Sequence, residues 1–308
     1  SDFVDLYYDG DYQGTYLLCE KVQVNPGRVD IEDLESKNED LNGSLSELEA
    51  VDGTNSYGLD IRYTKEARSP EDISGGYLIE HEQYEPRYSK EPVYFGVEVV
   101  DGYVQHFVCK SPDGWTKEEA DYVSCLFQDV FDSCRNGGVV PTWRGSRRAG
   151  MTTDQLVDLN SLAKLYWVNE LMKNGDGFIF SSTYIYKDSG MDSKLLFGPA
   201  WDFDLSSGNK NVFDGAEGIK NPVGWWTRES GIGLDLMRNP LVRKAVKDWK
   251  PRAVQAMEEL LVDGEFNALF NRSKSSHLMD AFVWGSKTET APMLRYWLER
   301  RMNWIEAQ

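Results

Sequence analysis

Residues 170–209 read ELMKNGDGFIFSSTYIYKDSGMDSKLLFGPAWDFDLSSGN, and their pattern decides the fold class of the chain. A helical pattern ends at an Asn-Gly pair, two short apolar segments follow, and a second loop reads Trp-Asp-Phe-Asp. The two segments, residues 181–187 and 194–197, predict a β-hairpin whose ends lie at one edge. Such a hairpin brings together the three carboxylates that flank it: Asp176, Asp202 and Asp204.

These three carboxylates predict a site for a hard cation. Like charges in one place repel one another unless a cation lies among them, and oxygen ligands favour Mg²⁺, Mn²⁺ or Ca²⁺ over zinc or copper. An EF-hand is excluded: counting from Asp202, Ser207 stands where that loop needs Gly and Phe213 where it needs Glu. An isolated Asp-x-Asp pair more often caps a turn, but the flanking aromatic residues and the preceding Asp176 favour the cation site.

Composition narrows the function classes. The 308 residues include 33 basic and 51 acidic side chains, a net charge of −18. Such an acidic surface repels nucleic-acid phosphates and anionic lipid, which counts against a nucleic-acid binder or a membrane-surface protein. No stretch resembles a transmembrane span, so we expect no membrane insertion. The acidic surface fits a basic protein substrate, bound divalent cations or plain solubility. Without Cys-x-x-Cys spacing, we expect the four cysteines to be buried thiols: Cys19, Cys109, Cys125 and Cys134.

Strand patterns dominate the first third of the chain. An Asp-Gly turn joins residues 3–8 and 15–24 as a predicted hairpin. Acidic residues 31–60 predict an excursion from the sheet, with a short helix near Leu45–Leu48. Three further strand patterns follow: residues 75–80, 93–100 and 103–110.

Helical patterns dominate the remainder. Thr116 and Glu119 form a capping box that opens a long helix. The other predicted helices cover residues 154–173, 234–237, 240–261, 266–284 and 291–306. The predicted fold class is therefore α+β. We expect one domain in two parts: β-rich residues 1–138, with the acidic insertion and one long helix, and α-rich residues 139–308, which carry the hairpin.

Short motifs are spread over nearly the whole chain. They are Gly10-x-Tyr12-x-Gly14-x-Tyr16-Leu17-Leu18-x-Glu20, Gly75-Gly76-Tyr77-Leu78-Ile79-Glu80, Lys110-Ser-Pro112, Asn174-Gly-Asp176, Ser182-x-Tyr184-x-Tyr186-Lys187-Asp188, Gly198-Pro-Ala-Trp201-Asp-Phe-Asp204-x4-Asn209 and the tail Leu294–Glu306. Together they resemble the CotH (spore coat protein H) kinase family, and the Gly-Pro-x-Trp-Asp-Phe-Asp block is the most specific part. The resemblance implies a two-lobed, atypical protein-kinase-like fold that binds ATP with a divalent metal and phosphorylates Ser or Thr of a protein. Protein kinases also present a catalytic Asp and a metal-binding Asp in this order.

The resemblance also implies roles for the acidic stretch. Asp176 would accept or orient the proton of the substrate hydroxyl. Asp202 would bind the metal that bridges the β- and γ-phosphates, with Asp204 as a second ligand. Ser182 or its neighbour Ser181 falls near the position where typical kinases use Asn to bind a second metal. Because serine is a weaker metal ligand than asparagine, a two-metal arrangement is in question.

Other motif residues would contact the nucleotide. Lys110 is a candidate for the lysine that grips the phosphates, with Glu118 or Glu119 as its acidic partner, although a solvated lysine at a strand end fits the pattern equally. The Gly10–Gly14 turn resembles a hairpin that covers the phosphates, or is simply a turn. Glu20, Glu80 and Asn209 are the remaining motif matches expected to contact the nucleotide. Glu20 and Glu80 alternate with apolar neighbours and so could face a cleft, although the exposed face of a strand fits them almost as well.

Two other function classes remain open at this point. One is a pseudokinase that binds nucleotide and metal without transfer. The other is a surface or carbohydrate-associated binding module, for which Trp225-Trp226 is the support, although burial in helix packing explains those rings as well. The resemblance implies a protein substrate, for instance a basic Ser/Lys-rich one, and a bacterial spore-coat, secreted or cell-surface location.

Overall fold

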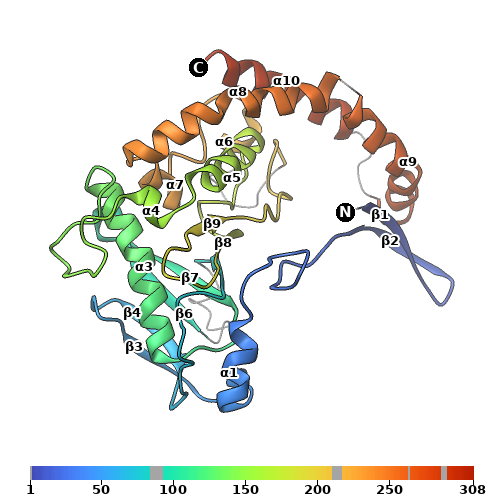
Figure 1. Cartoon of the computed structure of the whole chain (residues 1–308). Helices are drawn as coiled ribbons and strands as arrows, with labels where there is room; N and C mark the ends of the chain where they lie inside the picture. The colour runs from blue at the N-terminus through green and yellow to red at the C-terminus, as the bar shows by residue number, and fades with distance from the viewer. Residues whose placement is uncertain (1, 84–92, 210–216, 263, 286–289) are drawn as a thin grey trace.

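The fold is built on one seven-stranded antiparallel sheet (Figure 1). The computed structural model describes residues 2–83, 93–209, 217–262, 264–285 and 290–308. In spatial order the strands are β3 (Ala50–Thr54), β4 (Asp60–Thr64), β6 (Tyr94–Glu98), β7 (Val104–Ser111), β5 (Tyr77–His81), β8 (Thr183–Lys187) and β9 (Leu195–Phe197). Each neighbouring pair runs antiparallel. With the helices around this sheet, the expected α+β class is confirmed.

The hairpin β8–β9 belongs to this same sheet. β8 pairs with β5 along its whole length, so Ile79 lies opposite Ile185 and Glu80 opposite Tyr184. The sheet therefore runs across the expected boundary between residues 138 and 139. Leu78 and Tyr184 on one face pack against residues that follow the first hairpin, among them Val29.

The other face of the sheet is covered by α3 (Lys117–Arg135). Its capping box forms as predicted: the Thr116 amide donates to the Glu119 carboxylate at 2.7 Å, and the Glu119 amide donates to the Thr116 hydroxyl at 3.2 Å. The ring centroid of Phe107 lies 5.3 Å from that of Phe95 and 5.1 Å from that of Phe127 on the helix. Buried aromatic rings thus join α3 and the sheet into one core.

The expectation for acidic residues 31–60 is wrong in part. The segment forms α1 (Leu34–Asn42) and a 3₁₀ helix at Leu45–Glu47, close to the predicted short helix, but it then returns as the edge strand β3. The side chain of Asn55 accepts hydrogen bonds from the Tyr57 and Leu59 amides and turns the chain into β4. The pairing of β3 with β4, only a few residues further along the chain, outweighs the acidic composition that predicted an excursion from the sheet.

The single helix expected over residues 154–173 is also wrong. It is divided into α4 (Thr153–Leu156) and α5 (Leu159–Met172). The amide of Asp158 donates to the carbonyl of Leu195 in β9 at 2.9 Å, and its carboxylate accepts from the Ser161 amide at 2.6 Å. Asp158 therefore caps a new helix where the chain touches the sheet.

Four of the C-terminal helices agree with the predicted ones: α7 (Gly231–Leu236), α8 (Pro240–Val262), α9 (Glu265–Trp284) and α10 (Thr290–Glu306). The short helix α6 (Glu217–Lys220) was not predicted. A fully buried ion pair, Glu170–Arg301 at 2.6 Å, joins α10 to α5, and the Glu170 carboxylate also accepts the amides of Trp226 and Thr227. Trp225 packs half-buried against Trp304, with ring centroids 5.0 Å apart, so helix packing explains it. In the described part of the chain, no helix is both long and apolar enough to span a bilayer.

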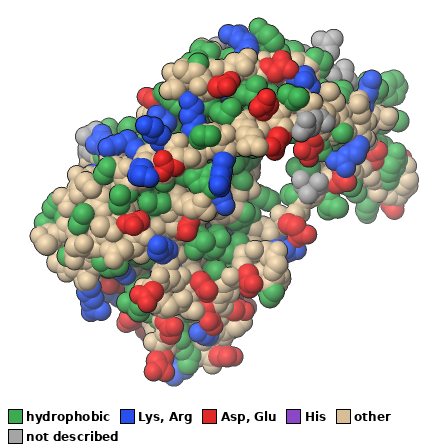
Figure 2. All heavy atoms as spheres, turned by 45° about the horizontal axis from the view of Figure 1, so that its top comes forward, with side chains coloured by type: hydrophobic (Ala, Val, Ile, Leu, Met, Phe, Trp, Pro, Cys, Tyr) green, Lys and Arg blue, Asp and Glu red, His purple; other side chains and the backbone are tan. Residues whose placement is uncertain are grey.

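The predicted N-terminal hairpin forms, but as a separate two-stranded sheet of β1 (Asp2–Tyr8) and β2 (Asp11–Leu18). It lies against α9, and together they make an arm beside the body of the molecule (Figure 1). Figure 2 shows an open gap between this arm and the body. β2 ends at Leu18, and Cys19 beyond it is exposed, so the expectation of four buried thiols holds for only three of them.

Candidate functional site

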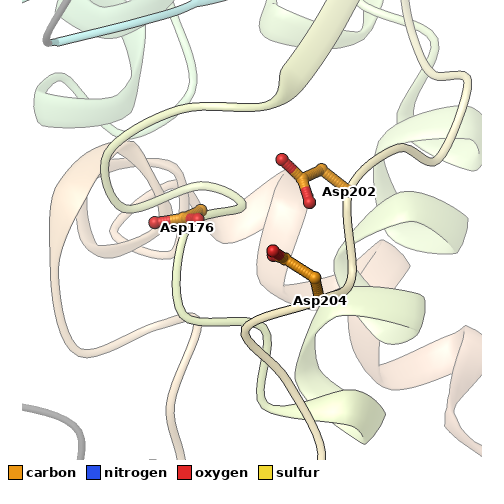
Figure 3. Close-up of side chains that lie close together, drawn as sticks. All are labelled: Asp176, Asp202 and Asp204. Atoms are coloured by element: carbon orange, nitrogen blue, oxygen red, sulfur yellow. The ribbon is translucent and has the colours of Figure 1, made fainter. Parts of the chain in front are cut away.

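The three aspartates of the central stretch meet as predicted. Asp176 stands in the loop after α5, and Asp202 and Asp204 stand in the loop after β9. One carboxylate oxygen of each lies within 4.8 Å of the others. Figure 3 shows the three side chains lying close together on these two loops. The hairpin β8–β9 between the loops makes this possible, because it returns the chain to the edge it left.

A buried asparagine that the sequence indicated only as a helix stop holds the two loops together. Nδ2 of Asn174 donates to the carbonyl of Asp202 at 3.0 Å, and Oδ1 accepts from the amide of Asp176 at 3.1 Å. The Gly175 amide also donates to the carbonyl of Leu205 at 2.7 Å. Asn174 itself is fully buried, while its partners Asp202 and Asp176 are exposed and half-buried, so it anchors the two loops from the core side.

Backbone strain is concentrated at the same place. The backbone φ angle is 58° at Asp202 and 57° at Ser182, a left-handed conformation that residues other than glycine seldom adopt. The Ser182 hydroxyl donates to Oδ2 of Asp202 at 3.4 Å. The structure therefore places Ser182 beside the carboxylates, as the family pattern implied.

The carboxylates destabilise one another's charged forms. Burial, followed by the charges of Asp202 and Asp204, raises the pKa of Asp176 from 3.8 to about 6. Burial, followed by the hydrogen bond with Asp202 and the charge of Asp202, raises the pKa of Asp204. A divalent cation would relieve this repulsion, and an all-oxygen donor set suits Mg²⁺, Mn²⁺ or Ca²⁺.

A cleft of about 1070 Å³ opens beside the aspartates. The residues after β2, including Glu20 and Arg28, form one wall, and the β9 loop with Asp202 and Asp204 forms another. Glu20 is in contact with Arg28 as an ion pair at 2.5 Å. The structure thus brings Glu20 to the same cleft as the acidic loop, and the cleft has the size of a small-molecule site.

Lys110 has a different acidic partner from the one expected. Its ammonium pairs with Glu80 at 3.5 Å, whereas Glu118 and Glu119 belong to α3 on the other face of the sheet. Burial raises the pKa of Glu80 to about 7, although Lys110 opposes the shift. Glu80 lies opposite Tyr184 on the face that also carries Tyr186, a cleft residue. Neither Lys110 nor Glu80 lines the cleft itself.

The remaining predicted residues lie elsewhere or act locally. Gly10 and Gly14 belong to the arm, where the amide of Thr15 donates to Asp280 of α9 at 3.1 Å, and the structure does not bring them to the aspartates. Asn209 donates through its side chain to the carbonyl of Asp204 and through its amide to that of Ser206. Asn209 therefore closes the acidic loop.

Taken together, these features define an α+β protein with a carboxylate site suited to a hard divalent cation beside a nucleotide-sized cleft. The family model described as CotH kinase protein matches residues 149–305, just over half of the chain. The chain belongs to this family, and the resemblance found in its motifs is confirmed. The match includes Asn174 and all three aspartates, whereas Glu20, Glu80 and Lys110 precede it. The chain has no match among curated proteins or among solved structures.

Proposed function

We propose that this protein is a CotH-type kinase that transfers the γ-phosphoryl group of ATP to a Ser or Thr hydroxyl of a protein, with a divalent metal. The observation that carries the proposal is the convergence of Asp176, Asp202 and Asp204 beside a cleft of about 1070 Å³. These aspartates fall within the segment that the kinase family matches.

Asp202 and Asp204 are the proposed metal ligands, with Ser182 nearby. Both aspartates stand on one loop that Asn174 and Asn209 hold in shape. Their fit rests on oxygen donors in close range and on the raised pKa of Asp204, which is typical of carboxylates crowded without a counter-charge. When bound, the metal neutralises charge on the β- and γ-phosphates.

Asp176 is the proposed base or positioning group. Its pKa of about 6 leaves most of the group ionised near neutral pH and still basic enough to share a proton. Asp176 orients the acceptor hydroxyl and receives its proton as the new oxygen–phosphorus bond forms. The bond between the γ-phosphorus and the β–γ bridging oxygen breaks, and ADP leaves with that electron pair.

The cleft supplies surfaces for the rest of the nucleotide. Tyr186 and Trp201 line it and offer aromatic faces for an adenine ring, while Arg28, which is paired with Glu20, has further guanidinium N–H groups for a phosphate. We further propose that residues 1–138 and 139–308 act as the two lobes of one kinase-like domain around this cleft. Lys110 paired with Glu80 remains the candidate phosphate-gripping lysine, and movement of the arm would be needed for Gly10–Gly14 to cover the phosphates.

Phosphoryl transfer tests the proposal directly. Labelled γ-phosphate should pass from ATP to a basic Ser/Lys-rich protein in the presence of Mg²⁺, Mn²⁺ or Ca²⁺. Asp202→Asn and Asp176→Asn should each lower the rate by about 10²-fold or more. Asp192→Asn, in the exposed β8–β9 turn, is the matched control and should keep full activity.

A thermal shift measurement separates the alternatives. Stabilisation by ATP with metal but no transfer to any protein would define a pseudokinase. No stabilisation by any nucleotide–metal pair would overturn the nucleotide site and leave a binding module. By family, we also propose association with a spore coat or cell surface, which fractionation of the source cells would test.

A further inference from the structure

A second cavity, of about 830 Å³, shares no lining residue with the aspartate cleft. One wall is α3, including Tyr122, and the other walls include residues 54–57, residues 145–151 and the β8–β9 turn. Alternation along β8 turns Lys187 away from the cleft side that Tyr186 faces. The volume falls within the range of ligand pockets, and the proposed kinase reaction uses none of these residues.

Basic side chains prevail in this cavity, against the acidic balance of the chain. Its two carboxylates belong to Glu118 and Asp121. The Asp121 carboxylate already accepts from the hydroxyl of Ser56 at 2.9 Å and from the Ser56 amide. Four basic residues line the cavity: Lys117, Arg147, Arg148 and Lys187.

The loop that carries both arginines, Arg147 and Arg148, is held in place by the protein without a ligand. Buried Asp129 on α3 accepts hydrogen bonds from the hydroxyls of Tyr57 at 3.0 Å and Ser146 at 2.7 Å, and from Arg148 at 3.1 Å. Arg147, next in the loop, is exposed and forms no ion pair or hydrogen bond with any residue that the structure describes. A rigid frame therefore presents an unpaired guanidinium.

Lys187 adds a second cation, although the charges of Asp188 and Asp72 act on it from beyond ion-pair distance. Its ammonium is buried and donates to the carbonyls of Asp188 at 3.1 Å and Gly190 at 3.0 Å, and over the described ranges it forms no ion pair. Burial, followed by the charge of Arg148, lowers the pKa of Lys187 to about 8. An anion between Arg147 and Lys187 would be attracted by both charges. It would also relieve the repulsion between Lys187 and Arg148.

We propose that this cavity binds a compact organic anion with several charged oxygens, either a phosphorylated or a polycarboxylate small molecule. Arg147 and Lys187 supply the charges, and Tyr57 and Tyr122 supply walls for the organic body. The proposal stands independently of the kinase reaction, because the aspartate site lies elsewhere.

Calorimetric titration of the full chain tests this site. Pyrophosphate and citrate are the two probes, and the Asp202→Asn protein is used in buffer freed of divalent metals by chelating resin, so that metal-dependent binding at the aspartates is silent. We expect saturable binding at one site per chain. Arg147→Glu should weaken it by about tenfold or more, because a charge-assisted contact becomes a repulsive one.

Arg272→Glu provides the matched control. It makes the same charge change at an exposed position of α9, and it should alter the affinity by no more than about twofold. Binding of pyrophosphate alone assigns the site to phosphorylated molecules, and binding of citrate alone assigns it to polycarboxylates. No saturable binding of either probe up to about 1 mM, or equal weakening in both variants, overturns the proposal.

Discussion

The loops that carry the aspartates and the arm formed by β1, β2 and α9 are stabilised in opposite ways. Behind the loops lie buried polar groups, Asn174 and the Glu170–Arg301 pair, each with several hydrogen bonds. In the arm, every residue of β1 is exposed, and so are apolar side chains of α9 such as Phe282. A two-stranded hairpin alone is marginally stable, so the arm depends on few contacts.

The difference shows what places a functional group accurately. Hydrogen bonds that are buried and fully satisfied specify one arrangement, whereas exposed apolar contacts tolerate several. The aspartates therefore keep their mutual geometry as a property of the core. The position of Gly10 and Gly14 depends instead on the contacts between β2 and α9.

The strongest test of this contrast removes a charge from the core beneath the loops. Arg301→Met leaves the fully buried Glu170 carboxylate without its counter-charge, and it should lower the free energy of unfolding by about 3–5 kcal/mol. Arg300→Met, at an exposed neighbouring position of α10, should change it by less than about 0.5 kcal/mol. Chemical denaturation measures both, and equal values would contradict the role of the buried pair.

A smaller effect is expected from the asparagine between the loops. Asn174→Ala leaves the Asp176 amide and the Asp202 carbonyl without their partner and should cost about 1–3 kcal/mol of stability. It should also weaken Mg²⁺ binding, because the aspartates lose their fixed spacing. Asn303→Ala on the exposed side of α10 serves as the control. Unchanged metal affinity in Asn174→Ala would show that the loops hold their shape without it.

The pH dependence of stability and of Mg²⁺ binding gives a third test, at Asp176. The folded-state pKa of Asp176 is raised from 3.8 to about 6, so the protonated form favours folding. That contribution is present below about pH 4 and is lost as the pH rises through about 6. A cation must displace the proton, so the thermal stabilisation by Mg²⁺ should grow between about pH 5 and pH 7. Asp176→Asn should flatten this dependence, and a parallel rise in both proteins would assign the titration to another group.

The smallest effect on stability belongs to the arm. Asp280→Ala removes the acceptor for the Thr15 amide and should change the free energy of unfolding by less than about 1 kcal/mol. Hydrogen exchange over β1 and β2 should nevertheless become faster, while exchange at Asn174 and its neighbours stays the same. Faster exchange at both places would mean that the arm and the loops open together.

Local pattern was sufficient for many elements. The capping box at Thr116, the hairpin β8–β9 and most C-terminal helices follow from spacing within a few residues. The strand β4 escaped prediction, since five residues between polar turns carry little periodicity. The break between α4 and α5 escaped as well, because it depends on a hydrogen bond from Asp158 to distant β9.

By itself the sequence determined that Asp176 meets Asp202 and Asp204, because a hairpin of local register returns the chain to the same edge. Only the tertiary structure decided that Lys110 pairs with Glu80, that Asn174 spans the two loops and that residues 50–54 join the sheet. The first depends on β5 lying beside β7, the second on the two loops meeting, and the third on β4 pairing with β6. Pairings between distant segments follow from the packing of the whole core, which no local pattern records.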